Sequence, residues 1–364
     1  MTAGNPADDV FSALAARFWH PVARSIDVRP GAVVGARVLD RDLAVFRADD
    51  GSVGVLDDLC AHRGARLSAG SVDDACLRCP YHAWSYDRNG RCTDIPQLAP
   101  EHPIPGHARA EAFRTSEHAG LIWTCLVDES RELRPRPTWP VTEAGTHWLH
   151  VGTVYEWNAQ AFRQVENFCD VAHFSVLHAD TFGNDKQMEM EPFHVTTRDD
   201  GYGIAFDYAY PSRDPTVVVG PGEKRPVVGT NFEYRLELPF TVALANASGP
   251  GSVMCIAASP TSATTMKLFW LCAFPLGVEV DGDAYETLEA KIWLPDRAIV
   301  EGPTSRTAAP RSGRGAARAL RPSRDRLSAR AACDRVLDCG GSGYVDRFGV
   351  ERSGVERSGA TRLT

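Results

Sequence analysis

The sequence predicts an α+β protein built mainly from antiparallel sheets. Short runs that alternate apolar and polar residues, the pattern of half-buried strands, recur along most of the chain. Asp-Gly pairs, which favour tight hairpin turns, stand between such runs at residues 50–51 and 200–201. Helical spacing is confined to residues 159–178 and 284–302. This balance favours antiparallel sheets accompanied by a few helices.

The composition is that of an ordinary globular chain. Its 364 residues are 43% hydrophobic and 24% charged. Since single hydrophobic cores stop growing near ~250–300 residues, two domains are expected. The net charge of −8 argues against nucleic acid as a partner. The start lacks a basic segment followed by an apolar run, and no stretch reaches the ~18 apolar residues that span a bilayer, so we predict a cytoplasmic protein without membrane association.

The first half of the chain reads as β-structure. Residues 30–59 alternate in short runs around the first Asp-Gly pair, and residues 121–127 return to a strand pattern. Residues 131–140 are charged and rich in proline, as linkers are. We therefore expect one domain over residues 1–135 and a second over 141–302.

The second half predicts one sheet with two helical segments. Residues 150–157 read as a strand, residues 159–178 as mostly helix, and residues 284–302 as a helix broken at Pro295. Further strands are expected at 193–210, 231–247, 252–260 and 266–276. Aromatic residues of these strands are candidates to line a pocket, with the core as the alternative position of each: Phe206, Tyr208, Phe232, Tyr234 and Phe240.

Most of the ten cysteines are expected to be buried side chains rather than disulfides, because the cytosol keeps thiols reduced. This interpretation applies to the cysteines that stand alone among apolar neighbours, namely Cys76, Cys92, Cys125, Cys169, Cys255 and Cys272. Cys60 and Cys79 differ because each has a histidine two or three residues later.

Two loops carry one cysteine and one histidine each. Cys60 and His62 form a Cys-x-His pair, and after sixteen intervening residues Cys79 and His82 form a Cys-x₂-His pair. Such a set suits zinc or an iron–sulfur cluster, and loops that bind no metal are the third alternative. Zinc fingers usually supply the cysteines as one pair and the histidines as the other. One of each per loop is what a Rieske [2Fe–2S] centre requires, because two thiolates hold one iron and two imidazoles hold the other.

The stretches CAHRG and CPYHAW, which contain these residues, resemble the two binding loops of the Rieske family. The resemblance implies that Cys60, His62, Cys79 and His82 bind a [2Fe–2S] cluster. Imidazole ligands reduce the negative charge around the cluster and raise its potential to ~−150 to +300 mV. An N-terminal all-β Rieske domain is therefore expected.

A second group of ligand-type residues lies in the segment VENFCDVAHFSVLH. Asp170 and His173, three residues apart, are expected to share a helix face, and His178 can join His173 if the helix ends between them. Alone, such a histidine pair is more often an ordinary surface or core feature. Two histidines and one carboxylate on one side of an iron form the facial triad of non-haem iron oxygenases, whose open positions admit O₂ and substrate.

With the Rieske-like loops upstream, residues 17–302 resemble the catalytic α-subunit of Rieske non-haem iron oxygenases, the aromatic-ring-hydroxylating dioxygenases and monooxygenases. The E-N-x-x-D-x-x-H-x₄-H pattern implies His173 and His178 as ligands of a mononuclear Fe(II). The stretch LPDRAIVE implies Asp296 as the third ligand, with Asp283 a poorer candidate. On its residues alone, Asp296 could instead be a first-turn acid of a helix that begins after Pro295.

The resemblance also implies an assembly and a catalytic domain of the antiparallel-sheet helix-grip type. In a head-to-tail homotrimer, Asp170 would accept hydrogen bonds from His173 and from His82 of the next subunit, and so act in catalysis as a bridge between the metal centres. Asn167 would line the iron pocket, with a place on the helix surface as the alternative.

The implied function is an oxidoreductase that uses O₂ and electrons from an NAD(P)H-dependent reductase, directly or through a ferredoxin. It would hydroxylate or oxidatively demethylate a small organic substrate, as a monooxygenase rather than a dioxygenase. The alternatives are a Rieske electron carrier, or an inactive relic without mononuclear iron chemistry.

The tail, residues 303–364, departs from the family. It contains 13 arginines, no lysine and 6 acidic residues, and by composition it predicts a disordered basic segment. Family members usually continue the I-V-E segment with a glutamine, whereas here Pro303 follows Gly302. Codons allowed for residues 302–310 give Gly-Gln-Arg-Pro-Glu-Gln-Leu-Pro when one C is dropped. We therefore hypothesise a frameshift near residue 303, which the nucleotide sequence of the gene decides.

Overall fold

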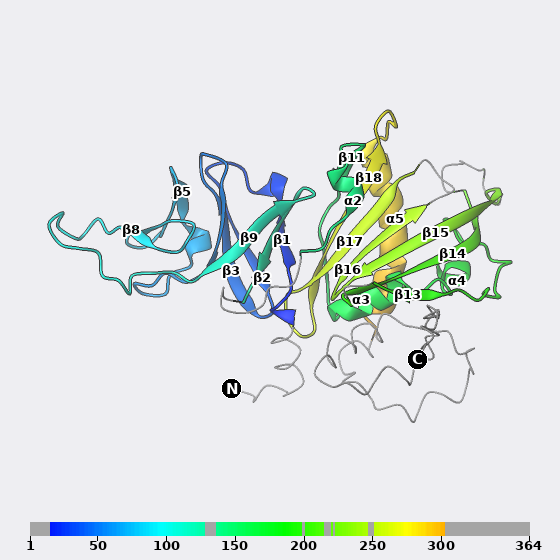
Figure 1. Cartoon of the computed structure of the whole chain (residues 1–364), viewed down its shortest axis with the longest axis horizontal. Coiled ribbons are helices and arrows are strands. Elements are labelled where there is room, and N and C mark those ends of the chain that lie inside the picture. The colour runs from blue at the N-terminus through cyan, green and yellow to red at the C-terminus, as the bar shows by residue number, and fades with distance from the viewer. Residues whose placement is uncertain are drawn as a thin grey trace, which may run out of the picture.

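The computed structural model describes residues 15–127, 136–198, 201–214, 220, 223–246 and 251–302. Two sheet-rich bodies lie side by side, the N-terminal one drawn in blue and cyan and the C-terminal one in green and yellow (Figure 1). Antiparallel strands with few helices make up both, so the predicted α+β class is confirmed. The arginine-rich tail falls outside the described residues.

The N-terminal body contains a six-stranded antiparallel sheet with the order β1-β10-β9-β4-β3-β2. The hairpin predicted at residues 50–51 joins β3 to β4, where Gly51 has a left-handed φ of 86°. Short 3₁₀ turns at Ser25–Asp27 and Leu67–Ala69 complete this body. The strands of the sheet are β1 (His20–Arg24), β2 (Val33–Val38), β3 (Arg41–Arg47), β4 (Val53–Asp57), β9 (Ala112–His118) and β10 (Leu121–Cys125).

A small four-stranded sheet is inserted between β4 and β9 and lies at the left end of the molecule in Figure 1. Its core contains Leu77 and Tyr86 together with Cys60 and Cys79, and it continues into β3 and β4 through Phe46 and Leu56. The two loops predicted to bind a cluster are therefore anchored in a hydrophobic core that the small sheet shares with the six-stranded sheet. The strands are β5 (Ser71–Asp73), β6 (Cys76–Arg78), β7 (Ser85–Tyr86) and β8 (Cys92–Asp94).

The C-terminal body is an eight-stranded antiparallel sheet with the order β11-β18-β17-β16-β15-β14-β13, and β12 also pairs with β18. The expected run at 231–247 consists of two strands, because the chain turns between Leu238 and Phe240. The strands are β11 (His147–Val151), β12 (Tyr155–Trp157), β13 (Val195–Thr197), β14 (Gly203–Arg213), β15 (Val227–Glu237), β16 (Thr241–Asn246), β17 (Val253–Pro260) and β18 (Met266–Pro275).

The helix predicted over residues 159–178 is two helices, α3 (Ala161–Phe168) and α4 (Phe174–Leu177). The Asp170 carboxylate accepts a hydrogen bond from the Ala172 backbone N–H at 2.9 Å, a local turn that competes with helix continuation. The prediction that Asp170 and His173 share a helix face is therefore wrong.

The last helix, α5 (Gly282–Val300), runs through Pro295 without a break, which corrects the second helical prediction. Proline removes one backbone hydrogen bond, here to the carbonyl of Lys291, and Lys291 is exposed, so water can satisfy that carbonyl. α5 lies against the sheet (Figure 1), where Trp293 and Val300 join its core. No helix of the described residues is long and apolar enough to cross a bilayer.

Four of the six cysteines expected in the core are buried, and Cys76 and Cys169 are partly exposed. Residues 131–135 of the expected linker lie outside the described residues, and the short helix α2 (Pro140–Glu143) follows them.

The two bodies share a hydrophobic cluster. Trp123 of β10 packs edge-on against Trp139 with ring centroids 5.6 Å apart, and residues of β17 and β18 complete the cluster. Backbone hydrogen bonds from Leu39 to Pro260 and from Asp40 to Thr261, at 2.8 and 2.9 Å, add to this contact. The relative position of the bodies is thus set by packing as well as by chain connection.

Replacing Trp139 by alanine is expected to destabilise the protein by about 3–5 kcal/mol, because it empties the centre of the shared cluster. Urea unfolding monitored by circular dichroism measures this change. Leu276→Ala, at a side chain that is 64% exposed, is the control and should change stability by less than about 0.5 kcal/mol. Equal effects of the two substitutions would contradict the assigned role of Trp139.

Candidate metal centres and their cavity

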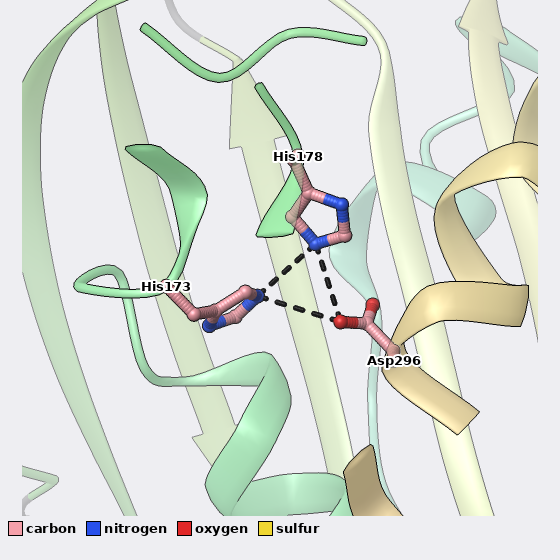
Figure 2. A group of neighbouring side chains, drawn as sticks. All are labelled: His173, His178 and Asp296. Carbon is pink, nitrogen blue, oxygen red and sulfur yellow. Dashed lines mark hydrogen bonds and ion pairs between the residues drawn. The ribbon is translucent and has the colours of Figure 1, made fainter. Parts of the chain in front are cut away.

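Three side chains from two distant segments converge in the C-terminal body (Figure 2). His173 precedes α4 and His178 follows it, so this one-turn helix holds the two imidazoles at its ends. Their Nε2 atoms lie 3.1 Å apart. The Oδ1 atom of Asp296, on α5, lies 3.5 Å from the first and 3.2 Å from the second.

This geometry fits a metal ion. Three ligands on one face of an octahedral ion, each bonded at ~2.1 Å, stand roughly 3 Å from one another. His178 and Asp296 are buried. At these distances the lone pairs of the two imidazole nitrogens and the carboxylate oxygen repel one another unless a proton or a cation lies between them. The chemistry of the donors, two imidazoles and one carboxylate, is that of the facial triad.

The fold around α4 leaves little freedom to His178. The Gly183 backbone N–H donates to the His178 carbonyl at 2.7 Å, and a Cβ on Gly183 would come within 2.0 Å of the Phe174 carbonyl oxygen. The Ser175 hydroxyl lies 2.9 Å from that of Tyr210, on β14. These contacts fix the helix and thereby the separation of the two imidazoles.

Asp296 sits in the last part of α5, with a side chain that is 6% exposed. The alternative of a first-turn acid is therefore wrong, because the helix begins at Gly282. Asp283 occupies that first turn and is away from the two histidines. Asn167, at the end of α3, donates from its amide nitrogen to Asp296 Oδ1 at 3.3 Å, which orients the carboxylate.

Asp170 lies beside the triad but points partly to solvent. Its Oδ2 is 3.8 Å from His173 Nδ1, and its side chain is 52% exposed. The Nδ1 atom itself is buried and forms no hydrogen bond with the described residues. A small movement of Asp170 would let it accept from this nitrogen, as carboxylates commonly do beside metal-bound histidines.

The cysteine loops share one backbone design. The Gly64 N–H donates to the Cys60 carbonyl at 2.9 Å, and the Ala83 N–H donates to the Cys79 carbonyl at 3.1 Å. Gly64 and Ala83 occupy the same place in their loops and both have left-handed φ values, 71° and 60°. Both cysteines are thus presented by the same type of turn.

The side chains of these loops converge as a cluster would require. The rings of His62 and His82 have centroids 4.4 Å apart, and both cysteines are 3% exposed. The Tyr86 hydroxyl lies 3.2 Å from Cys60 Sγ, a contact that can tune a cluster through its sulfur ligand.

The pKa shifts of His62 and Cys60 also fit the binding of a metal cluster. Desolvation and the neighbouring His82 lower the pKa of His62, which favours the neutral imidazole that a metal binds. The His62 Nδ1 atom is buried without a hydrogen-bond partner among the described residues. Burial raises the pKa of Cys60, so its thiolate needs a nearby positive charge such as iron.

A cavity of about 180 Å³ adjoins the triad. Phe232 and Tyr234 line it, as the sequence suggested, whereas Phe206, Tyr208 and Phe240 belong to the core. The remaining lining is mainly apolar and contains Phe168, Phe174, Phe182, Leu244, Met254, Ile292 and Trp293, with Ser212 and Asn246. An engineered cavity of ~150 Å³ holds benzene, so this space suits a molecule about the size of one substituted ring.

Glu289 is a cavity residue that the sequence analysis missed. It is 6% exposed, and its side chain interacts with the Tyr285 hydroxyl on the same helix. Burial raises the pKa of Glu289 to about 7. Its seven-residue spacing from Asp296, two helical turns, is the signal that could have identified it.

Comparisons with known proteins identify the family. The model of the Rieske [2Fe-2S] domain matches residues 18–113, and the model of the vanillate O-demethylase oxygenase C-terminal domain matches residues 157–314. The chain belongs to the Rieske non-haem iron oxygenases. The Rieske domain implies a [2Fe–2S] cluster, and oxygenases of this family use a mononuclear iron.

Named relatives support the same assignment. The chain is 32% identical over 237 residues to methylxanthine N1-demethylase NdmA of Pseudomonas putida, covering 62% of this chain and 63% of the relative. The match therefore spans less than two thirds of the relative's length.

Two solved structures share the fold. Pseudomonas putida NdmA with caffeine superimposes with a TM-score of 0.72 at 24% identity and covers 91% of this Rieske oxygenase and 90% of that chain. Dicamba monooxygenase bound to dicamba gives a TM-score of 0.68 at 20% identity, with 88% and 95% covered.

The raised pKa of Glu289 predicts a pH-dependent stability difference. Between pH ~4.5 and ~7 the folded state binds more protons at this site than the unfolded state, so stability falls as the pH rises through this range. Glu289→Gln removes this pH dependence. From pH 5 to pH 8, the free energy of unfolding of the variant should therefore rise by up to about 3 kcal/mol relative to that of the wild type. Urea unfolding at both pH values measures it.

Glu279→Gln, at an exposed acid that precedes α5 and lies outside the cavity lining, is the control. Its stability difference from the wild type should change much less with pH. A constant difference between Glu289→Gln and the wild type from pH 5 to pH 8 would contradict the raised pKa.

Proposed function

We propose that this chain is the oxygenase component of a system that uses O₂ and reductase electrons to hydroxylate or oxidatively demethylate a small organic substrate. The observation that carries the proposal is the convergence of His173, His178 and Asp296 beside an apolar cavity, in a chain with Rieske loops. In this proposal, residues 1–135 bind the cluster and residues 141–302 oxidise the substrate.

The metal ligands are assigned on the same geometry. His173, His178 and Asp296 bind Fe(II), and the cluster is bound by Cys60, His62, Cys79 and His82. When bound, these groups supply the electron storage and O₂ activation that side chains cannot provide.

The protein contributes position and the exclusion of water. Asn167 orients the Asp296 carboxylate through its hydrogen bond, and α4 fixes the spacing of the two imidazoles. The apolar cavity walls hold one face of the substrate toward the triad and keep bulk water away from it. Monooxygenation or demethylation is favoured over dioxygenation, because two similar proteins are a methylxanthine N1-demethylase and dicamba monooxygenase.

A homotrimer is proposed for electron delivery. The small sheet with the cluster loops lies at one end of the molecule and α4 lies toward the other (Figure 1), which favours transfer between neighbouring copies over transfer within one chain. Asp170, half exposed beside His173, is placed where it could also meet His82 of a neighbouring copy.

An NAD(P)H-dependent reductase, acting directly or through a ferredoxin, is the proposed electron source. Tyr81 and Leu59, on or next to the cluster loops, are 63% and 54% exposed, which provides apolar contact area for a protein partner. A cytoplasmic location is part of this proposal, because the reductase draws on NAD(P)H.

Iron analysis tests the proposed function. The purified, reconstituted protein should contain about three irons per chain, two in the cluster and one at the triad. His178→Ala should lose about one iron while the EPR signal of the reduced cluster stays unchanged. His147→Ala, which changes a β11 histidine outside both centres, should retain all three. Two irons in the wild type would favour an electron carrier and contradict an oxygenase.

Asp170→Asn tests the bridge. Both metals should remain bound, while oxidation of the pre-reduced cluster in a single turnover should slow by ~10–100-fold, because the anionic acceptor is lost. Asp180→Asn, at an exposed acid on the same segment, is the control and should react normally. A normal rate for Asp170→Asn would refute the bridging role.

A further inference from the structure

The cavity contains a second acid, which the proposed chemistry does not use. Glu289 and Asp296 both line it from α5. Seven residues along a helix are about two turns, so the two side chains project from one face, with their backbones about 10 Å apart along the helix axis. Asp296 belongs to the metal triad, and Glu289 therefore marks a second position along the same cavity wall.

Glu289 lacks a positive partner within the described residues. No lysine or arginine is among the cavity residues, and the group found to stabilise the ionised carboxylate is the Tyr285 hydroxyl. Tyr285 in turn interacts with Cys272, a buried thiol of β18. A buried carboxylate with one neutral hydrogen-bond donor is costly, and it gains most from a ligand that brings positive charge and N–H groups.

Other cavity residues point to a polar, planar ligand. Tyr234 Oη and Trp293 Nε1 are buried without hydrogen-bond partners among the described residues, although both residues line the cavity. Phe168 stacks on Trp293 with ring centroids 5.9 Å apart and meets Tyr234 edge-on at 6.3 Å. Aromatic faces beside a carboxylate form a favourable environment for a cationic, ring-sized molecule.

We propose that Glu289 selects the substrate, by binding a positively charged N–H group of a small aromatic or heterocyclic molecule. This inference rests on the proposed function, because it takes the cavity as the substrate site. The charge-assisted hydrogen bonds to Glu289 anchor the nitrogen at one end of the cavity. The carbon to be oxidised then lies toward His173, His178 and Asp296, so nitrogen and reacting carbon belong to opposite ends of the molecule.

A pair of isosteric probes tests this selection. Benzamidine and benzamide have nearly the same shape, but benzamidine is a cation at pH 8 and benzamide is neutral. Isothermal titration calorimetry on the iron-loaded protein should give benzamidine at least about tenfold tighter binding, as expected for hydrogen bonds to a charged group.

The variant Glu289→Gln should weaken benzamidine binding by at least about tenfold and leave benzamide binding within about twofold. Glu286→Gln, the same change outside the cavity, should bind both probes as the wild type does. The visible spectrum of the cluster and the melting temperature check that each variant is folded.

Two results would overturn the proposal: wild-type protein that binds benzamide as tightly as benzamidine, or Glu289→Gln that binds benzamidine unchanged. The first can be read even if the variant fails to fold. Binding is measured without reductase or turnover, so this test does not depend on whether the protein catalyses the oxygenase reaction. The proposed oxygenase function and the proposed selection by Glu289 can therefore be contradicted independently.

Discussion

The structure depends on holding two histidine nitrogens and one carboxylate oxygen close enough together to bind a single metal ion. His173 and His178 lie at the two ends of a one-turn helix, and Asp296 arrives from α5, more than a hundred residues later. Without a cation, their approach to between 3.1 and 3.5 Å is unfavourable, so the surrounding sheet must enforce it. The Gly183 turn, the Asn167 hydrogen bond and the packing of Trp293 on the sheet together provide that restraint.

The same requirement accounts for the surroundings of the triad. An ion at this point needs open positions for O₂ and substrate, and the apolar cavity leaves space beside it without supplying competing ligands. The cluster loops are anchored in a core that joins the small sheet to β3 and β4 at the far end of the molecule. The shared Trp123–Trp139 cluster keeps the two bodies in a defined relation.

Sequence reasoning succeeded where the information is local. Cys60 to His82 span one short segment, so their types and spacing suffice to suggest the cluster, and alternation of apolar residues suffices for the strands.

Sequence reasoning failed where contacts between distant parts of the chain decide the structure. The turn at Asp170 and the helix through Pro295 depend on hydrogen bonds and exposure that periodicity does not report. Glu289 looks like a surface residue of a helix, and only its packing against the sheet reveals it as a buried acid. The role of Asp296 as a ligand follows from the family resemblance and from no local pattern of residues.

The most direct measurement is anomalous diffraction at the iron absorption edge from crystals of the reconstituted protein. The account predicts one strong peak between the Cys60–His62 and Cys79–His82 loops. A second peak should lie within about 2.3 Å of His173 Nε2, His178 Nε2 and an oxygen of Asp296. Absence of the second peak in fully loaded protein, or its coordination by other residues, would contradict the claim that these three side chains form the oxygen-activating iron site.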